Sequence, residues 1–466
     1  MKRPMTGRHR RLRDADVIAR HPAAADCLKT ILMTRLNSLI RVPAAATAGA
    51  NVTWFWRITR PRMIPHSPLS RIGRWVAALG LAAATTVGAT APSFANSGDF
   101  VRSLWPEAQQ RGVSRSAFEA AFAGYSYIPK VMELTRKQPE FTQTVQQYID
   151  RRVTASQAQK GQAMRQEWAQ TLAGTQQRWG VQPEIVLAIW GMETNFGGFM
   201  GGENTIYALA TLTEGGYRSS FFRDELLTAL RIVSDGHVSP KQMVGSWAGA
   251  MGHTQFMPSS FMRFAVDYNG DGRKDIWNSV PDALGSTANY LNHFGWRPGE
   301  TWGYEVKVPA GFDFTAARQM EKAPLSQWQA MGITRVSGRA FPRPSDPARL
   351  YMPAGANGPA FLLLPNFEVI KRYNNSDSYA LAVGHLADRI IGGGPFATPW
   401  PANDYALTKA QRAELQTLLN RAGFDVGAPD GVIGPKTRAA VAAWQQRQGW
   451  PADGHVSGRV LDALKR

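Results

Sequence analysis

The distribution of apolar residues predicts that the larger, first part of the chain is helical. Residues 99–180 carry apolar side chains at helical spacing. The segments 114–122 and 141–149 each begin with or near a Ser or Thr, residues that cap helices well. Further amphipathic helices are predicted at 205–212 and 221–234. The pattern therefore predicts a mainly helical fold.

A β-rich stretch interrupts this helical pattern. Apolar segments at 304–308, 332–336 and 360–364 are bounded by Pro and Gly, as short strands commonly are. Helical spacing resumes at 379–391. The predicted fold class is α+β, mainly α, with residues 300–365 as a small β-rich insertion.

A Gly- and Pro-rich linker at 393–404 marks a domain boundary before a compact tail, residues 405–466. Helices are predicted in the tail at 408–422, 437–448 and 457–465, which together make a three-helix bundle. Besides Leu side chains, its predicted core contains Phe424, Ile433, Val441, Trp444 and Leu461.

One carboxylate interrupts an otherwise apolar helical stretch, residues 185–198. Glu193 lies near the end of this stretch, just before Gly197 and Gly198, which stop the helix. Burial and the negative end of the helix dipole both favour the protonated acid, which is the form a general acid needs. The alternative is a core Glu that is paired with an Arg or with backbone N–H groups.

Residues 245–258 combine small residues with Trp247, Phe256 and Met257. This composition indicates tight packing beside a cleft. The alternative is a close crossing of helices, in which Ser246 and Gln255 are incidental polar groups.

Residues 267–278 match much of a calcium-binding loop. Asp267, Asn269 and Asp271 occupy its first, third and fifth positions, and Arg273 falls at the seventh, where only a backbone carbonyl is needed. The twelfth position, usually Glu, is Asn, although Asp282 lies downstream and could close the site. A structural calcium ion and a metal-free turn are both consistent with this pattern.

The formal charge of +18 does not indicate a nucleic-acid-binding protein. Residues 1–74 hold fifteen Lys and Arg against three Asp, a net of +12, so only +6 remains for the rest of the chain. A mildly basic remainder suits an anionic polymer or a membrane surface. We therefore expect no nucleic-acid partner.

The basic excess precedes a predicted secretory signal peptide, residues 63–95. Basic residues, a short apolar run and small residues before the cleavage point are typical of such a segment. Residues 1–62 are predicted to be a mis-annotated or disordered extension, and they hold the only cysteine, Cys27. We expect a soluble exported protein without a stable membrane anchor after cleavage; an uncleaved signal acting as an anchor is the alternative.

Several motifs together resemble the B-type lytic murein transglycosylases over roughly residues 98–392. The motifs are IWGMETNFG at 189–197, SWAGAMG at 246–252, QFMPSS at 255–260 and RYNNS at 372–376. The tail, with DGVIGPKTR at 430–438, is similar to the three-helix peptidoglycan-binding module of cell-wall enzymes.

This resemblance implies a lysozyme-like catalytic core within residues 96–392 and a periplasmic location. The implied reaction cleaves peptidoglycan glycan strands between N-acetylmuramic acid and N-acetylglucosamine without water and leaves a 1,6-anhydromuramyl end. No cofactor is required, and partnership with other cell-wall enzymes is left open.

The resemblance also implies roles for individual residues. Glu193 matches the single catalytic acid/base, and the Asp267 loop matches a calcium-binding loop that is one residue shorter in the family. The implied substrate-binding residues are Ser246, Gln255, Tyr290, Tyr373, Asn374 and Tyr379.

Two other functions are consistent with the sequence. A hydrolytic muramidase needs a second carboxylate, for which Glu214 or Asp224 is available. A non-catalytic cell-wall-binding protein would use both parts of the chain for adhesion.

Overall fold

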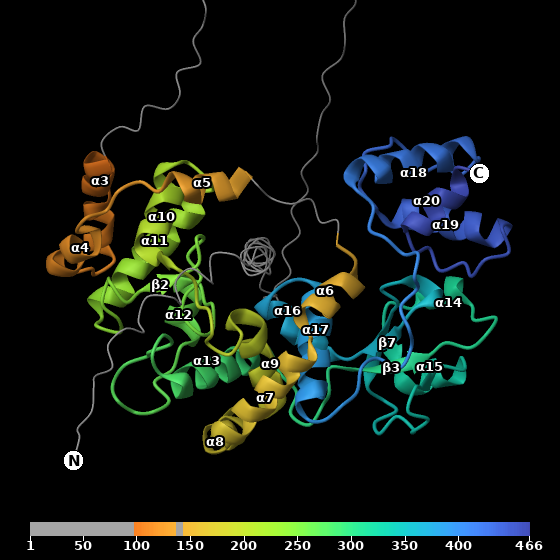
Figure 1. Ribbon diagram of the computed structural model, residues 1–466, viewed down its shortest axis with the longest axis horizontal. Coiled ribbons are helices and arrows are strands. Elements are labelled where there is room, and N and C mark those ends of the chain that lie inside the picture. Colours follow the sequence, from red (N-terminus) through yellow and green to blue (C-terminus); the bar gives the residue numbers. More distant parts are fainter. Residues whose placement is uncertain (1–96, 137–142) are drawn as a thin grey trace, which may run out of the picture. The chain divides into compact units, whose positions relative to one another are not determined.

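The computed structural model describes residues 97–136 and 143–466 (Figure 1). The predicted extension, the signal peptide and Cys27 lie outside the described residues. None of the helices within the described ranges combines the length and the apolar composition needed to cross a lipid bilayer.

The predicted mainly helical fold is confirmed. The described chain begins with helices α3 (Ser97–Gln110), α4 (Arg115–Phe122), α5 (Pro129–Arg136), α6 (Val145–Arg152), α7 (Ala155–Glu167) and α8 (Ala169–Trp179). Ser114 caps α4 through its side chain, and Thr144 forms a capping box with Gln147 at the start of α6. The sequence had placed the second of these helices at 141–149, partly outside the described residues.

Helix α9 (Pro183–Thr194) lies at the centre of the main core. Every residue from Ile185 to Thr194 is buried. The helix packs against α7, α8, α13 (Val280–His293) and α17 (Asp377–Ile390). A helix enclosed in this way must be apolar on all sides, which explains its almost unbroken apolar sequence.

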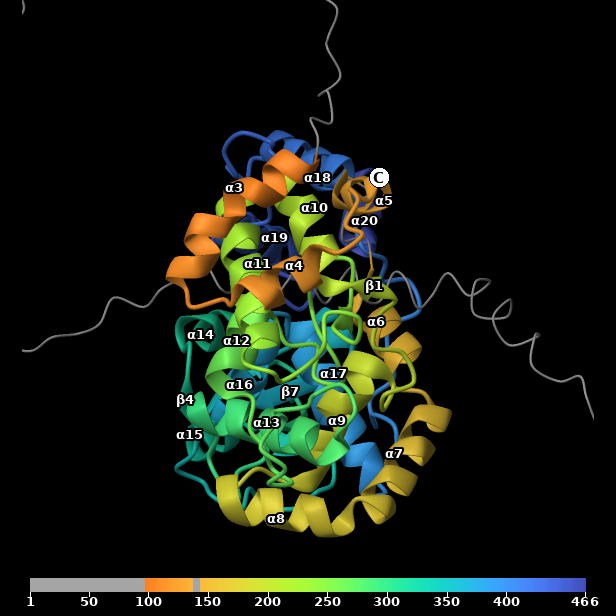
Figure 2. The same cartoon turned by 90° about the vertical axis from the view of Figure 1, so that its left-hand side faces the viewer.

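Helices α10 (Thr205–Glu214) and α11 (Ser219–Ser234) pack side by side. Helices α3, α4 and α5 in turn contact this pair, so the N-terminal helices form one group with α10 and α11 (Figures 1 and 2).

A small antiparallel sheet joins this group to the segment with the SWAGAMG motif. Strand β1 (Glu203–Asn204) pairs with β2 (Val244–Gly245). Glycine is required at Gly245, where a Cβ would lie 2.2 Å from the carbonyl oxygen of Ala250. The tight packing predicted for 245–258 is therefore present: the backbone at Gly245 lies directly against the backbone at Ala250.

The β-rich insertion has its own core. Its five strands are antiparallel and ordered β4-β6-β7-β3-β5. They are β3 (Gly303–Lys307), β4 (Ala323–Pro324), β5 (Thr334–Arg335), β6 (Pro347–Tyr351) and β7 (Ala360–Leu363), with helices α14 (Phe314–Gln319) and α15 (Leu325–Ala330). The sequence predicted β3, β5 and β7 but missed β4, β6 and both helices.

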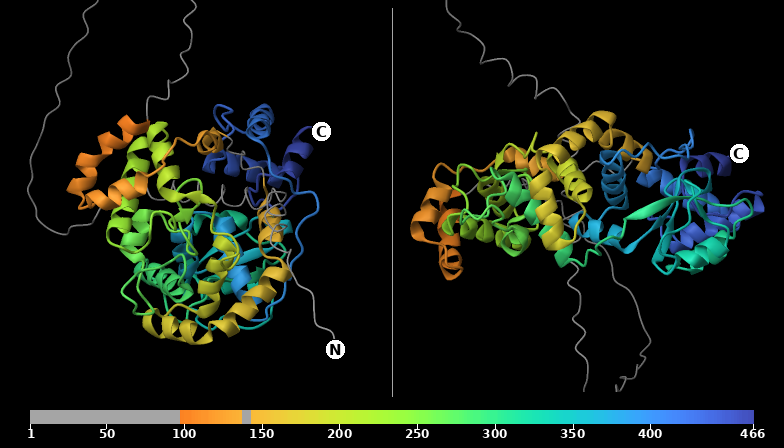
Figure 3. Two further views of the ribbon diagram at one scale, coloured as in Figure 1. Left: turned by 60° about the vertical axis from the view of Figure 1, so that its left-hand side comes forward. Right: turned by 90° about the horizontal axis from the view of Figure 1, so that it is seen from below.

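After the insertion the chain returns to the main core (Figure 3). Strand β7 runs directly into α16 (Pro365–Tyr373), and α16 packs on both α17 and α13. Neither α16 nor α12 (Pro258–Phe264) nor α13 was predicted as a helix, although Pro within the first turn favours each of them.

The tail contains the three predicted helices, α18 (Lys409–Arg421), α19 (Pro435–Arg447) and α20 (Gly458–Leu464). Their core includes Leu415, Val441, Trp444 and Leu461. Ile433 is only half-buried and lies outside this core, contrary to the prediction.

Candidate active site around Glu193

Glu193 lies in the last turn of α9 and is 3% exposed. The Tyr379 hydroxyl donates a buried hydrogen bond of 2.8 Å to Glu193 Oε1. Tyr379 is fully buried in the first turn of α17, and the side chain of Ser376 caps that helix by accepting from the Tyr379 backbone N–H. Two packed helices, distant in sequence, thus bring together the predicted acid and one predicted substrate-binding residue.

A left-handed turn ends α9 directly after Glu193. Asn195 and Phe196 have φ of 52° and 55°, values that are unusual for residues other than glycine. The turn is held by the Thr194 hydroxyl, which accepts from Gly197 N at 3.1 Å, and by Lys160, whose Nζ donates to Asn195 O at 2.7 Å. The position of Glu193 is therefore fixed from the C-terminal side as well.

His253 supports the same turn, although no role was predicted for it from the sequence. The Trp190 indole N–H donates to His253 Nδ1 at 3.0 Å, and the Thr194 hydroxyl donates to His253 O at 3.3 Å. Burial lowers the pKa of His253 to about 4, against a smaller opposing effect of Asp275. The ring is thus neutral, with its proton on Nε2.

Ser246 and Gln255 shape the turn that follows β2. Ser246 Oγ accepts from Ala250 N at 3.1 Å, while Gln255 donates through Nε2 to Met200 O at 2.9 Å. Gln255 also has a φ of 49°, so its backbone is strained. Both side chains are almost fully buried, at 2% and 1% exposure. The Ser246 side chain stabilises the turn up to Ala250, and the Gln255 side chain links this turn to the loop at Met200.

Tyr373 and Tyr290 link the RYNNS segment to this turn. The Tyr373 hydroxyl donates to Thr254 O at 2.7 Å, and the Tyr290 hydroxyl donates to Arg372 O at 2.5 Å. Their rings lie 4.8 Å apart. Asn374 directly follows α16 and is buried. These contacts tie the RYNNS segment to the loop before Gln255 and to α13, and both Tyr hydroxyls bind backbone carbonyls.

Two polar groups in this region were missed by the sequence analysis. Trp247 Nε1 and Thr254 Oγ1 are buried and have no hydrogen-bond partner among the described residues. A buried polar group without a partner costs about 1–3 kcal/mol, so such groups point to a bound ligand or water. Both lie in the segment 245–258, where the excess of small residues drew attention to packing alone.

Glu225 is a second buried carboxylate that the sequence analysis missed. Its oxygens accept from Ser259 N at 2.8 Å and from Ser259 Oγ at 2.6 Å, directly after the QFMP segment. Burial raises the pKa of Glu225 to about 7, with Ser259 opposing the shift. No signal distinguished Glu225, since it occupies an ordinary position in an amphipathic helix.

The two carboxylates considered for a hydrolytic mechanism are engaged by the N-terminal helices. Glu214 accepts from the Tyr125 hydroxyl at 2.7 Å and from Ser97 Oγ at 3.0 Å. Asp224 pairs with Arg111 at 2.7 Å, and its side chain is 66% exposed. These contacts give neither carboxylate a link to Glu193.

In the Asp267 loop, the carboxylates of the loop accept hydrogen bonds from the loop's own backbone N–H groups. Asp267 accepts from the N–H groups of Gly270, Asp271 and Gly272, and Asp271 accepts from Arg273 N. Asn269 Nδ2 lies 3.3 Å from Asp271 Oδ2, and Arg273 Nη2 lies 3.7 Å from the same atom.

Asp282, which the sequence analysis used to close the loop, is buried and belongs to α13. Its two oxygens accept from the N–H groups of Tyr268, Asn269 and Asp275. Among the described residues no group of three or more His, Cys, Asp or Glu side chains is placed to hold a metal ion. The Asp267 and Asp282 carboxylates bind the loop's own backbone N–H groups, and these bonds hold the loop in its present shape.

Two families match the chain. The transglycosylase SLT domain matches residues 96–388, and the putative peptidoglycan binding domain matches residues 408–464. The membrane-bound lytic murein transglycosylase B of Escherichia coli (strain K12) is 35% identical over 249 residues, which span 52% of this chain and 66% of that protein.

Several solved structures resemble the fold. SltB3 from Pseudomonas aeruginosa, in complex with NAG-anhNAM-pentapeptide, is 45% identical with a TM-score of 0.74, over 81% of this chain and 100% of SltB3. The Escherichia coli lytic transglycosylase Slt35, in complex with calcium, is 31% identical with a TM-score of 0.53, over 64% of this chain and 94% of Slt35. With a catalytic-domain match over more than half of its length, the chain belongs to the MltB- and SltB-type family of lytic transglycosylases and carries a C-terminal peptidoglycan-binding module.

Proposed function

We propose that the protein cleaves the β-1,4 bond between N-acetylmuramic acid and N-acetylglucosamine in peptidoglycan and leaves a 1,6-anhydromuramyl end. The observation that carries this proposal is the buried pair of Glu193 and Tyr379, at the end of a core helix in a chain of this family. The related SltB3 was solved with a fragment named as an anhydro sugar, which supports the same product here.

Glu193 acts first as an acid in this proposal. Because Oε1 accepts from Tyr379, the transferable proton belongs on Oε2. This proton passes to the glycosidic oxygen as that oxygen leaves the muramyl anomeric carbon. Positioned general acid catalysis contributes on the order of 10² to 10⁴-fold in rate.

Glu193 then acts as a base. The muramyl 6-hydroxyl attacks the anomeric carbon, and its proton returns to the carboxylate, so no water is consumed. The Tyr379 hydroxyl stabilises the carboxylate between the two steps through a hydrogen bond to a charged acceptor. One carboxylate therefore suffices, where hydrolytic glycosidases commonly use two.

Ser246, Gln255, Asn374 and the neighbouring Tyr residues are proposed to bind or shape the site for the sugar. The buried Trp247 indole N–H and Thr254 hydroxyl support this proposal, because sugar hydroxyl and acetamido groups would satisfy them. Tyr290 and Tyr373 are proposed to act by positioning backbone, since their hydroxyls bind carbonyl oxygens.

The test compares the products of the wild-type protein with those of Glu193→Gln on purified sacculi. Mass spectrometry of the soluble muropeptides should find anhydro ends with the wild type and none with the variant. Glu184→Gln is the matched control, because Glu184 lies in the first turn of the same helix. It should retain full activity.

Three results would contradict the proposal. Anhydro products from Glu193→Gln would exclude Glu193 as the acid. Reducing ends heavier by one water would identify a hydrolytic muramidase, and wild-type protein that binds sacculi without releasing any product would identify a non-catalytic wall-binding protein.

We further propose that residues 405–466 form the peptidoglycan-binding domain and that residues 63–95 direct export to the periplasm. The match of residues 408–464 to a putative peptidoglycan binding domain supports the first statement. Pelleting of the isolated tail with sacculi tests it. N-terminal sequencing of the exported protein tests the second, with Asn96 as the expected first residue.

A further inference from the structure

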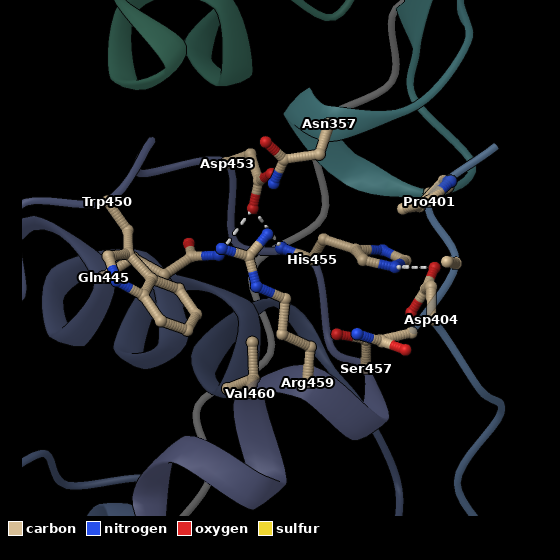
Figure 4. A pocket seen from close by; sticks show the side chains of 13 residues that line it. Asn357, Pro401, Asp404, Gln445, Trp450, Asp453, His455, Ser457, Arg459 and Val460 are labelled. Atoms are coloured by element: carbon tan, nitrogen blue, oxygen red, sulfur yellow. Dashed lines mark hydrogen bonds and ion pairs between the residues drawn. The ribbon is translucent and has the colours of Figure 1, made fainter. Parts of the chain in front are cut away.

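A pocket of about 220 Å³ lies where the tail, the linker and the β-rich insertion meet. Trp450, Arg459 and Gln445 of the tail line it, together with Asp404 of the linker and Asn357 of the insertion (Figure 4). The residues that line it come from both family matches and from the linker between them, and neither match assigns the junction a role.

The acidic groups of the pocket are already satisfied. Asp453 accepts from Gln445 Nε2 at 2.7 Å and from His455 N at 2.8 Å, and its second oxygen accepts from Ala356 N at 2.6 Å. Asp404 lies 2.9 Å from His455 Nε2. These bonds fix the walls and leave no carboxylate for a cationic ligand.

In contrast to these satisfied acidic groups, the charged side chain of Arg459 has no partner of opposite charge in the described part of the chain. Its guanidinium carbon lies 4.5 Å from the centre of the Trp450 ring, and it forms no ion pair with any carboxylate of the described residues. The side chain extends from α20 towards the other residues that line the pocket (Figure 4). Arg459 therefore offers its charge to a ligand, and stacking on Trp450 holds it in place.

A second, larger cavity of about 660 Å³ continues from the first. The two share Asp404, Trp450 and Arg459 among their lining residues, and the second is also lined by Gln146 and Gln147 of α6. We call these two cavities together the junction groove. Its walls are rich in amides, with one arginine in the shared part that lacks a partner carboxylate.

We propose that the junction groove binds the stem peptide of peptidoglycan, with Arg459 holding a peptide carboxylate. This inference rests on the proposed function of the tail as a peptidoglycan-binding domain. Arginine matches carboxylate geometry, and the Gln and Asn side chains can pair with peptide N–H and C=O groups. Arg459 covers one face of the Trp450 ring, so that face is not open for stacking on a sugar.

The experiment measures binding of the full chain to sacculi, with Glu193→Gln in every protein to prevent digestion. Arg459→Gln is compared with Arg447→Gln, because Arg447 stacks on Phe424 at the same 4.5 Å but lines neither cavity. Arg459→Gln should weaken binding on the order of tenfold, as expected for loss of a charged hydrogen bond, and Arg447→Gln should not. Thermal melting confirms that both variants fold.

A second arm uses sacculi from which an amidase has removed the stem peptides. On this bare glycan the parent protein and Arg459→Gln should bind equally. Equal binding of the two Arg variants to intact sacculi would overturn the inference, and an Arg459→Gln defect that persists on bare glycan would assign the groove to the glycan strand instead. If the parent protein itself fails to bind sacculi, the proposed function of the tail is wrong, a result distinct from the other two.

Discussion

The hydrogen bond between Tyr379 and Glu193 joins two helices through the proposed acid. Tyr125 forms a comparable bond with Glu214, 2.7 Å long, in the N-terminal group of helices. Among the residues that the structure describes, Tyr–Glu hydrogen bonds thus occur both at the proposed acid and away from it.

Tyr379→Phe should lower kcat on the order of tenfold or more with little change in KM, because it removes a hydrogen bond to the carboxylate without changing the ring. The measurement is the initial rate of muropeptide release from sacculi. Tyr125→Phe is the control and should leave kcat unchanged. An equal loss of kcat in both variants would mean that the effect comes from general destabilisation.

Glu225 predicts a pH dependence of stability. Its pKa is about 7 in the folded protein against 4.5 for an ordinary Glu, so the folded state holds the proton more tightly. The free energy of unfolding should therefore fall as pH rises from about 4.5 to about 7, on the order of 3 kcal/mol from this group, and change no further above that range.

Glu225→Gln should remove this contribution while keeping a group that can bind Ser259. Urea unfolding at pH 4.5 and pH 8 provides the measurement, and the variant should lose less stability between the two pH values than the wild type. Asp388 also has its pKa raised to about 7 by burial, so Asp388→Asn is measured in parallel. Identical pH dependence of Glu225→Gln and the wild type would contradict the assignment.

The sequence located Glu193 because a lone carboxylate in an apolar stretch is visible without a structure. It could not reveal Glu225, whose burial depends on α12 packing against α11. Nor could it give His253 a role, because the contacts of His253 with Trp190 and Thr194 join segments about sixty residues apart. Local sequence patterns can therefore identify a candidate catalytic residue, whereas the residues that position it are identified only from tertiary contacts.

At the level of elements, helices α10, α11 and α17 were predicted close to their observed bounds, whereas α12, α13 and α16 were not predicted. The helix predicted from residue 408 is present as α18, and the structure shows that Thr408 forms a capping box with Gln411 at its start. Strand β6 was missed because only one of its five residues, Ala348, is fully buried, so its sequence lacks an apolar run. Its place in the sheet comes from pairing with β4 and β7, which the local sequence does not encode.

The Asp267 loop gives a prediction at this scale. Because Asp267 and Asp282 already accept hydrogen bonds from backbone N–H groups, the loop should keep its fold without a cation. Thermal unfolding in excess calcium and in excess chelator should give melting temperatures within about 1 °C of each other. A rise of several degrees in calcium would show that the carboxylates rearrange to bind it.

At the level of the whole molecule, the linker is bound to the catalytic region. The N–H groups of Ala397 and Thr398 both donate to the Glu305 carboxylate at 2.8 Å, and the Phe396 ring stacks on His385 at 3.9 Å between centroids. The Gly- and Pro-rich composition of residues 393–404 predicted a domain boundary. It did not predict that the linker binds Glu305 and His385 of the catalytic region. Pro401 and Asp404 of the same linker line the junction groove.

Glu305→Ala should release the linker, because it removes the acceptor of both backbone N–H groups. Limited proteolysis followed by mass spectrometry should find faster cleavage within 393–404 than in the wild type. Glu321→Ala, an exposed change in the same insertion, is the control and should not alter the rate. Unchanged cleavage in Glu305→Ala would show that the aromatic contacts alone hold the linker.

The left-handed turn after Glu193 has a consequence for inhibitor design. Helix ends ordinarily fray, but here Lys160, Thr194 and a Gln157 bond to Gly191 O hold the last turn of α9. The proposed acid, Glu193, is therefore held rigidly and cannot move to follow a flexible ligand. The sugar ring must adapt instead, so compounds that are already locked in the distorted ring shape of the oxocarbenium state should bind more tightly than flexible substrate mimics.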